Sequence, residues 1–486
     1  MSAIAVIVTT PLIGAAVLAM VPGHRLGSRL NIGFSAVTLL ASLVLFGLEP
    51  SSGALFVVDA FNIYLIALTA FVGLTTSVFS AGYIAHEIAI GKLDERKLRF
   101  YHAMYQAFMF TMLLALSANN LGVMWVAVEG ATLTTVLMVS LYRTAASIEA
   151  AWKYFILCGV GIALALFGTI LMYMAAQPVM GPGMAAMTWT ELMGHVAKIS
   201  PAILNLAFVF LLIGYGTKVG LAPLHAWLPD AHAEGPTPIS AVLSGLLLNV
   251  ALYAVLRFKM LLSANGEAIA PGPLMIAMGL ASLLLAGLML YRRRDVKRFF
   301  AYSSIEHMGI ITFAFGMGGP LANFAGLLHM AMHSLTKSAI FYAVGHAVQV
   351  TGTQRMDRIS GLTVSHPALG WGLLAGVVAI AGLPPFGVFM SEFLLVTSTF
   401  AREPLLALPL VVGILVAFGA LVLRVQQLCF GAPGLVDGGG GAPVASVPVR
   451  GSLVPLYAHL ALVLVAGVWL PGPLVAWFQT VAALLG

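Results

Sequence analysis

Long apolar runs dominate this sequence and leave few folds open to it. About fourteen runs are long enough to cross the roughly 30 Å hydrocarbon core of a bilayer, and 60% of all residues are hydrophobic while 8% are charged. Inside a bilayer every backbone polar group must be bonded internally, which a helix achieves within one segment. The sequence therefore predicts an all-α integral membrane protein. The predicted spans are 3–21, 32–48, 58–82, 103–118, 121–142, 152–175, 201–222, 239–262, 272–291, 299–318, 321–349, 369–400, 404–429 and 452–480.

Lysine and arginine are unevenly distributed between the predicted loops. The loops after odd-numbered spans hold seventeen of them, with concentrations at 92–99 and 292–298, whereas the loops after even-numbered spans hold four. Loops rich in Lys and Arg stay on the cytoplasmic side. We therefore expect a multi-pass protein of the bacterial inner membrane with both termini in the periplasm. The net charge of +6 is explained by this bias and does not indicate a nucleic-acid partner.

Neither cysteine suggests a cofactor. Cys158 and Cys429 lie in apolar runs and form no CxxC pair, so the sequence gives no basis for an iron–sulfur cluster, a zinc site or a disulfide. We expect no cofactor in this chain, and any redox chemistry would take place on another subunit.

Four polar residues of metal-ligand type follow one another between prolines in PLHAWLPDAHAEGPTP. They lack the HExxH spacing that puts two histidines on one helix face. A hydrogen-bond network that holds the neighbouring chain is favoured over a metal site. The four residues are His225, Asp230, His232 and Glu234.

Two predicted spans are interrupted by proline. Lys218 stands just before LAPLHAWLP in the seventh span, and Glu392 stands just after the break in GLPPFGVF in the twelfth. Proline removes a backbone donor and breaks a helix. An offset of five spans inverts the second copy relative to the first. Broken helices in corresponding positions are typical of transporters built from inverted repeats; two packing kinks are the alternative.

Glu129 and Lys218 place opposite charges in the hydrophobic interior. A charge at the centre of a span costs about 2.5–3.5 kcal/mol on insertion scales, so such residues usually serve transport. Burial and a neighbouring lysine act in opposite directions on a carboxyl group's affinity for a proton. A Glu and a Lys whose separation changes would form a proton switch, whereas helix capping or snorkelling by the Glu is the structural alternative.

The eleventh span carries three titratable residues at four-residue spacing. His329, His333 and Lys337 fall on one helix face, along about 12 Å at 1.5 Å rise per residue. Imidazoles titrate near neutral pH and suit a proton relay through bound water. His307 in the tenth span adds a fourth group, and a hydrogen-bonded packing histidine is its alternative role.

Three further residues complete the candidates. Glu392 is expected to act as the exit carboxylate of the relay. Lys153 either snorkels to the cytoplasmic surface or joins Glu129 and Lys218. Glu306 lies near the start of its predicted span and is expected at the membrane interface.

The segments TKVGLAPLHAWLPDAHAEGPTPISAVLSG and GLPPFGVFMSEF resemble the proton-conducting, antiporter-like membrane subunits shared by respiratory complex I, cation/proton antiporters and group 4 membrane-bound hydrogenases. The resemblance covers nearly the whole chain. The forms SSIEHMG and SGLLLNVALYAVLRF look most like the hydrogenase-4 component F branch.

The resemblance implies a domain organisation and a set of site residues. It implies N-terminal helices in 1–100, inverted five-helix repeats in 101–262 and 270–430, a Gly-rich linker in 431–451 and a last helix in 452–486. The ionisable residues matching the family pattern are Glu129, Lys218, Lys337 and Glu392. The family often has a Lys or His in the eighth helix, where this chain has Asn249, so water is expected to bridge the relay there.

These observations favour a proton-translocating subunit of a redox-driven complex, of the hydrogenase-4, formate hydrogenlyase or complex I type. Its expected partners are other membrane subunits and a peripheral hydrogenase or dehydrogenase arm. The alternatives are a Na⁺/proton antiporter module and a subunit that energises inorganic carbon uptake. A structural role, as a membrane scaffold that conducts no ions, is a further alternative. It would explain the apolar spans but not the buried charges.

Overall fold

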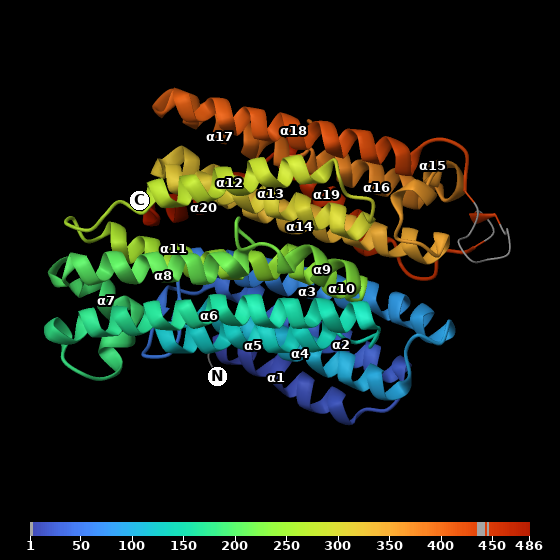
Figure 1. Cartoon of the computed structure of the whole chain (residues 1–486). Coiled ribbons are helices and arrows are strands. Elements are labelled where there is room, and N and C mark those ends of the chain that lie inside the picture. The colour runs from blue at the N-terminus through green and yellow to red at the C-terminus, as the bar shows by residue number, and fades with distance from the viewer. Residues whose placement is uncertain (1–2, 435–442, 445–446) are drawn as a thin grey trace.

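The computed structural model describes residues 3–434, 443–444 and 447–486. Helices running side by side along one direction make up nearly all of it (Figure 1). Both chain ends lie toward the end of the bundle that carries the short helix α7 (Trp189–His195). The all-helical membrane architecture predicted from the apolar runs is confirmed.

Several helices of the N-terminal half begin directly after a polar capping residue. Asp59, Asp94, Asn120 and Thr144 accept hydrogen bonds from backbone N–H groups in the first turns of α3, α4, α5 and α6, which satisfies donors that a helix leaves open. The helices are α1 (Ala3–Met20), α2 (His24–Val44), α3 (Ala60–Ala89), α4 (Glu95–Ser117), α5 (Leu121–Val139), α6 (Ala145–Met180) and α8 (Pro201–Val219). Short elements are η1 (Leu45–Gly47), β1 (Ser51–Ser52), β2 (Val57–Val58), η2 (Met184–Met187) and η3 (Val196–Lys198).

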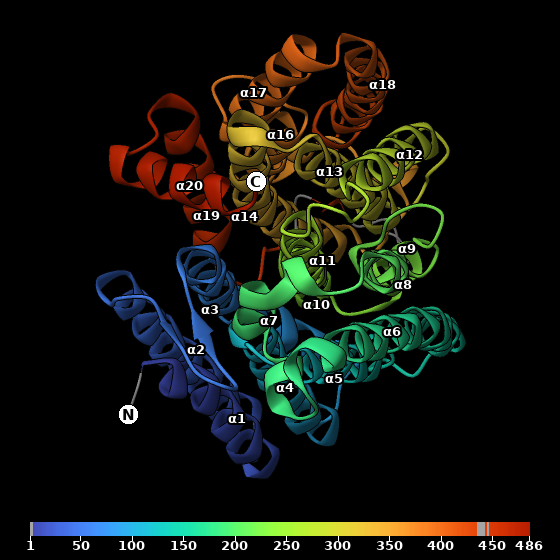
Figure 2. The same cartoon turned by 90° about the vertical axis from the view of Figure 1, so that its left-hand side faces the viewer.

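A continuous helix in the centre of the bundle joins the two halves. It consists of α10 (Thr237–Val242), the π-helical turn η4 (Leu243–Leu247) and α11 (Leu248–Ser263), and its apolar window is 100% buried. The end-on view shows α11 surrounded by helices of both halves (Figure 2). Short α9 (Trp227–Glu234) precedes it. π-helical turns often occur at functional sites.

The C-terminal half repeats the pattern of long helices with one broken member. It contains α12 (Gly272–Leu290), α13 (Val296–Met317), α14 (Gly319–Thr351), η5 (Met356–Arg358), α15 (Leu362–Ser365), α16 (Pro367–Ile380), α17 (Gly387–Arg402), α18 (Pro404–Cys429), α19 (Val454–Val468) and α20 (Gly472–Leu484). α13 and α14 are joined through Gly318, whose φ of 60° suits glycine.

Both helix breaks predicted from proline are present. α8 ends at Val219 and α9 begins only at Trp227. α16 ends at Ile380 and α17 begins at Gly387. Each break thus opens a non-helical segment inside the bundle, which is tolerated at membrane depth only where protein or water surrounds it.

The number of membrane crossings depends on how many helices are long and apolar enough to span a bilayer. Among the described residues, nine helices are long and apolar enough to cross a bilayer, or ten if the bent pair α19 and α20 forms one span. The long helices α4, α13 and α14 do not belong to those nine. Each predicted span falls on a helix or a broken helix, but fourteen crossings remain a prediction.

The last predicted span is wrong in form. Residues 452–480 were expected to make one helix, but α19 and α20 meet at 81°. Pro471 and Gly472 stand at this bend and interrupt the helix.

The predicted domain boundaries fall partly between helices and partly within one. The boundary at 100/101 falls inside α4, which begins at Glu95, whereas those near 262–270 and 430 fall in connections between helices. Of the Gly-rich linker 431–451, residues 435–442 and 445–446 lie outside the described part of the chain.

Candidate functional site

Lys218 occupies the last turn of α8, just before the first break. Only 2% of the residue is exposed. Its Nζ donates to Thr132 Oγ1 at 2.7 Å and to the Tyr154 hydroxyl at 2.8 Å. These two oxygens on α5 and α6 replace part of the hydration that an ammonium loses on burial.

Aromatic rings complete the surroundings of Lys218. Its Nζ lies 4.5 Å from the centre of the Tyr154 ring and 5.6 Å from that of Trp227. The two rings stack on each other at 4.5 Å, and Trp227 Nε1 donates to the Thr217 carbonyl across the break. The break therefore brings a ring from α9 against the lysine, where cation–π attraction stabilises the charge.

Glu129 lies near Lys218 without a direct hydrogen bond to it. It is half-buried on α5, three residues before Thr132, and interacts electrostatically with Lys218. Its Oε2 is buried and has no hydrogen-bond partner in the described part of the chain. The Lys218 ammonium donates to the Thr132 hydroxyl instead. Glu129 and Lys218 are therefore both close to this hydroxyl, without a direct hydrogen bond between them.

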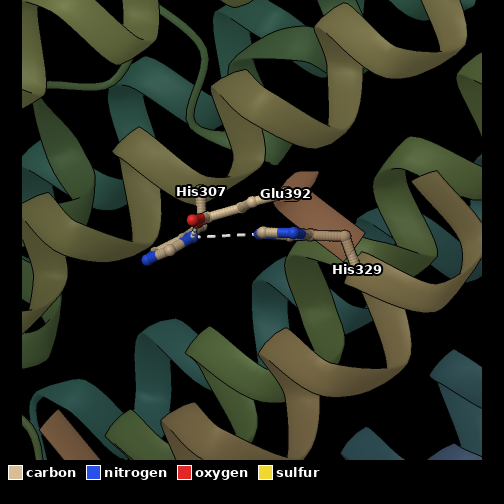
Figure 3. Close-up of side chains that lie close together, drawn as sticks. All are labelled: His307, His329 and Glu392. Atoms are coloured by element: carbon tan, nitrogen blue, oxygen red, sulfur yellow. Dashed lines mark hydrogen bonds and ion pairs between the residues drawn. The ribbon is translucent and has the colours of Figure 1, made fainter. Parts of the chain in front are cut away.

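The second break adjoins a compact group of three buried side chains. His307 on α13, His329 on α14 and Glu392 on α17 place one nitrogen or carboxylate oxygen each within 4.8 Å of one another (Figure 3). His307 Nδ1 lies 3.0 Å from His329 Nε2 and 4.0 Å from Glu392 Oε1. These three helices carry residues far apart in the sequence into one cluster, which we call the His–His–Glu cluster.

Glu392 reaches this cluster because of the backbone at the second break. Gly382 has φ of 68°, and a Cβ at this position would overlap the end of the Glu392 side chain. Glycine adopts this backbone conformation without strain, and a larger residue would displace the carboxylate.

Glu306 corrects the sequence-based expectation. It was expected at the membrane interface but is 2% exposed, and its Oε2 lies 3.1 Å from His307 Nε2. That contact falls outside hydrogen-bond geometry, since both atoms have no hydrogen-bond partner among the described residues. The misjudgement came from the helix start: α13 begins at Val296, which places Glu306 three turns inside it.

The stripe on α14 lies on one buried face, as its spacing predicts. The ring of His307 lies 5.2 Å from that of His329 and 5.8 Å from that of His333. Both nitrogens of His333 are buried without a hydrogen-bond partner among the described residues. Lys337 is fully buried, and its Nζ donates to the Phe300 carbonyl at 3.1 Å.

Asn249 is tied to α14 by its amide nitrogen. Nδ2 donates to the Met330 carbonyl at 3.1 Å and to Ser334 Oγ at 2.8 Å. Its Oδ1 is buried and has no partner among the residues described. Asn249 therefore contacts α14 at the residues that directly follow His329 and His333, with one acceptor left over that suits a bound water.

Lys153 lies at the surface and away from the buried groups. Its side chain is 49% exposed and pairs with Glu149 at 2.7 Å and Asp230 at 3.3 Å. The structure places it in the surface position that the sequence left open as one of two alternatives.

The polar residues after the first break divide into two sets. Asp230 and Glu234 pair with Arg298 at 3.1 and 3.2 Å, which ties α9 to the start of α13 in the kind of network the sequence favoured. His232 differs, because it is 0% exposed and neither ring nitrogen has a described partner.

His232 and a pair of serines are further buried polar groups near the two halves' contact. His232 contacts the Phe341 ring at 5.2 Å and interacts electrostatically with Lys337. Ser244 Oγ on the π turn lies 2.7 Å from Ser304 Oγ on α13. The sequence analysis named His232 only as part of the polar cluster after the first break, and it missed the serine pair, which no pattern within a single helix marks.

Comparison with known proteins assigns the chain to a family. The family model described as NADH:quinone oxidoreductase/Mrp antiporter, TM, matches residues 118–417. The Hydrogenase-4 component F homolog of Methylacidiphilum infernorum (isolate V4) is 60% identical over 485 residues, which cover 100% of both chains.

Two solved structures share the fold at low identity. One chain of the membrane-bound sulfane sulfur reductase (MBS), an archaeal respiratory membrane complex, gives a TM-score of 0.85 at 21% identity over 100% of this chain and 98% of that one. One chain of the Mrp complex from Dietzia sp. DQ12-45-1b gives 0.84 at 20% identity, covering 100% and 97%. With a family match over more than half of its length and a relative that aligns from end to end, this chain belongs to the family of transmembrane subunits of NADH:quinone oxidoreductases and Mrp antiporters.

Proposed function

We propose that this chain moves protons across the membrane as a subunit of a redox-driven complex, of the hydrogenase-4, formate hydrogenlyase or complex I type. The observation that carries the proposal is the pairing of each helix break with buried titratable groups. Lys218 adjoins the first break and the His–His–Glu cluster adjoins the second. Unpaired intramembrane charges are costly and are kept where they serve an ion path.

In the first half, Lys218 would hold and release the proton. Thr132 and Tyr154 bind the ammonium through oxygen atoms, while the Glu129 carboxylate interacts with it electrostatically. Movement of Glu129 toward the lysine would favour its charged form, and movement away would favour release. The short α9 and the break provide a place for such movement.

In the second half, protons would pass among neighbouring groups. Lys337 and His333 lie about one turn apart on α14, and the His333 ring lies 5.8 Å from that of His307. His307 lies beside Glu306 and is hydrogen-bonded to His329. Glu392 is the terminal carboxylate of the series. Asn249, His232 and the Ser244–Ser304 pair would organise the water that joins the two halves.

We extend the proposal to partners, location and repeats. The 60% identity to a protein named Hydrogenase-4 component F homolog supports a hydrogenase arm and neighbouring membrane subunits as partners. The loops 92–99 and 292–298 would face the cytoplasm of a bacterial inner membrane, with both termini in the periplasm. The two broken helices would occupy equivalent positions in inverted repeats 101–262 and 270–430.

Cysteine labelling tests this orientation. Single cysteines introduced at exposed Lys92 and Arg292 should react with a membrane-impermeant maleimide only in inside-out vesicles. Labelling of either cysteine in intact cells whose outer membrane has been permeabilised would reverse the assignment. A cysteine at exposed Glu191, near the opposite end of the bundle, should show the converse pattern.

Proton flux in proteoliposomes tests the function itself. The assembled complex should acidify or alkalinise the vesicle lumen when its redox substrates are added, at a rate independent of Na⁺. Dependence of the flux on Na⁺ would instead indicate an antiporter module, and redox turnover without any proton movement would indicate a scaffold. Lys218→Ala should abolish flux while redox subunits stay attached.

A further inference from the structure

The His–His–Glu cluster has the composition of a transition-metal site. Two imidazoles and one carboxylate, with one open position, form a common set of ligands for Zn²⁺ in proteins. At metal–ligand distances of about 2.0–2.1 Å, tetrahedral ligand atoms stand about 3.3 Å apart. His307 Nδ1 and His329 Nε2 lie 3.0 Å apart, and His307 Nδ1 and Glu392 Oε1 lie 4.0 Å apart. These two separations bracket the required value, and all three ligand atoms lie within 4.8 Å of one another.

Hydrogen bonds on the far side of His329 leave a lone pair facing the cluster. Ser391 Oγ donates to the Val388 carbonyl at 2.8 Å, so its oxygen is free to accept from His329 Nδ1 at 2.9 Å. With the hydrogen on Nδ1, the neutral ring presents an unprotonated Nε2. A metal-binding histidine usually has such a partner on its second nitrogen.

His307 has a corresponding partner. Its Nε2 lies 3.1 Å from Glu306 Oε2, and a small ring rotation would complete a hydrogen bond from Nε2 to that carboxylate. With His329 Nε2 unprotonated, His307 Nδ1 is the donor in the 3.0 Å hydrogen bond between the two rings. A bound metal would replace that hydrogen, and His307 would then carry its hydrogen on Nε2, toward Glu306.

Burial limits what can enter the cluster and from where. His307 and His329 are 1% and 2% exposed, whereas the Glu392 side chain retains 10% exposure. The carboxylate on α17 is therefore the accessible boundary of the cluster. The Glu392 carboxylate fills the space that a side chain at Gly382 would need, because a Cβ there would overlap its nearest oxygen.

We propose that His307, His329 and Glu392 form a binding site for one divalent transition-metal ion of the Zn²⁺ class. Glu306 and Ser391 orient the two imidazoles as positioning residues. Binding follows from the ligand geometry alone. A consequence that does rest on the proposed function is that the bound metal blocks proton transfer, because it occupies the same imidazole nitrogens.

Metal binding to the purified complex tests the site without any proton gradient. Metal analysis after equilibration with Zn²⁺ should find one ion per complex that depends on this cluster. X-ray absorption at the zinc edge should show two imidazole ligands and a carboxylate oxygen at about 2.0–2.2 Å. An environment without imidazole would overturn the proposal even if no variant could be purified.

Substitutions provide the second measurement. His329→Gln and Glu392→Gln should each weaken Zn²⁺ binding by more than about 100-fold, beyond the about 10- to 100-fold effect of losing an outer partner, which we expect for Ser391→Ala. His102→Gln is the control, since His102 is a buried histidine like His329 but lies on α4 and has no hydrogen-bond partner among the described residues. Unchanged binding in His329→Gln, or equal loss in His102→Gln, would contradict the site.

Flux measurements separate the inference from the proposed function. Zn²⁺ should inhibit redox-driven proton flux of the unmodified complex, and Ser391→Ala should need about tenfold more Zn²⁺ for half-inhibition relative to its own metal-free flux. Flux without metal binding would contradict the metal site alone. Metal binding without any redox-driven flux would contradict the proposed function alone.

Discussion

The two helix breaks carry buried groups of opposite character. Beside the first break, the ammonium of Lys218 is held by two hydroxyls and two aromatic faces. Beside the second, the His–His–Glu cluster brings three proton acceptors within 4.8 Å. The first site thus holds one lysine, bound by hydroxyls and aromatic rings with Glu129 nearby, and the second holds several groups that can exchange one proton.

This difference suggests a division of labour between the halves. A lone ammonium can release its proton only if its surroundings change, so the first site depends on movement of Glu129 or of the break. Imidazoles in contact pass protons by rotation and tautomer exchange, which requires little backbone movement. Replacement of Lys218 at the first site should therefore stop conduction, while the effect of a substitution at the second site should depend on how many titratable groups remain.

The largest expected effect is at Lys218. Lys218→Arg should reduce redox-driven flux to the leak of empty liposomes, because a guanidinium keeps its proton throughout the accessible pH range. Lys259→Arg is the matched control: Lys259 is a buried lysine on α11, whose Nζ donates to the Leu485 carbonyl away from both breaks. Full flux in an assembled Lys218→Arg complex would remove the lysine from the path.

Glu392 should come next. Glu392→Gln keeps the shape but removes the titratable group, and we expect flux to fall about 100-fold, the lower end of the range for positioned proton-transfer groups. Gly382→Ala should lower flux by a smaller factor, since its Cβ would displace the carboxylate without removing it. Exposed Glu403 supplies the control Glu403→Gln, which should conduct normally. Equal flux in Glu392→Gln and the control would show that the carboxylate beside the second break does not carry protons.

Much of the fold followed from local rules. Proline placed both breaks, and capping residues such as Asn120 and Asp295 mark helix starts that separate closely spaced spans. The bend between α19 and α20 was missed because hydrophobicity alone shows a continuous apolar run and gives no weight to Pro471. Local chemistry thus predicts where a helix stops better than apolar length does.

The sequence named most residues of the candidate site, but it predicted only some of the contacts between them. Spacing on α14 correctly placed His329 and His333 on one face, because helix geometry fixes it. The contact of Glu306 with His307 and the bond from Asn249 to α14 depend on how separate helices pack, which no single-helix pattern contains. The hydroxyl of Thr132 was missed for the same reason.

A smaller effect is expected from the hydroxyl between Glu129 and Lys218. Thr132→Val removes one of the two oxygens that bind the ammonium, and a hydrogen bond to a charged group is worth about 1.5–3 kcal/mol. We expect flux to fall about tenfold. Thr134→Val is matched in type and helix, because the Thr134 hydroxyl bonds only to backbone carbonyls in the bonds described, and it should retain flux. A fall of the same size in both would indicate a general packing effect on α5.

The smallest effect concerns Asn249, where the two halves meet. If Oδ1 holds a water that carries protons, Asn249→Leu should slow flux about twofold, equivalent to a barrier change of about 0.5 kcal/mol, and Asn249→His should restore it by supplying a titratable nitrogen. Ser334→Ala removes a partner of Nδ2 but leaves Oδ1 in place, so it separates packing from conduction. A packing role alone, worth about 0.6 kcal/mol per interhelical hydrogen bond, predicts lower thermal stability in both variants and unchanged flux per assembled complex. Flux normalised to complex, measured beside thermal unfolding, distinguishes these outcomes, and equal flux in Asn249→Leu and Ser334→Ala would take the amide out of the path between the breaks.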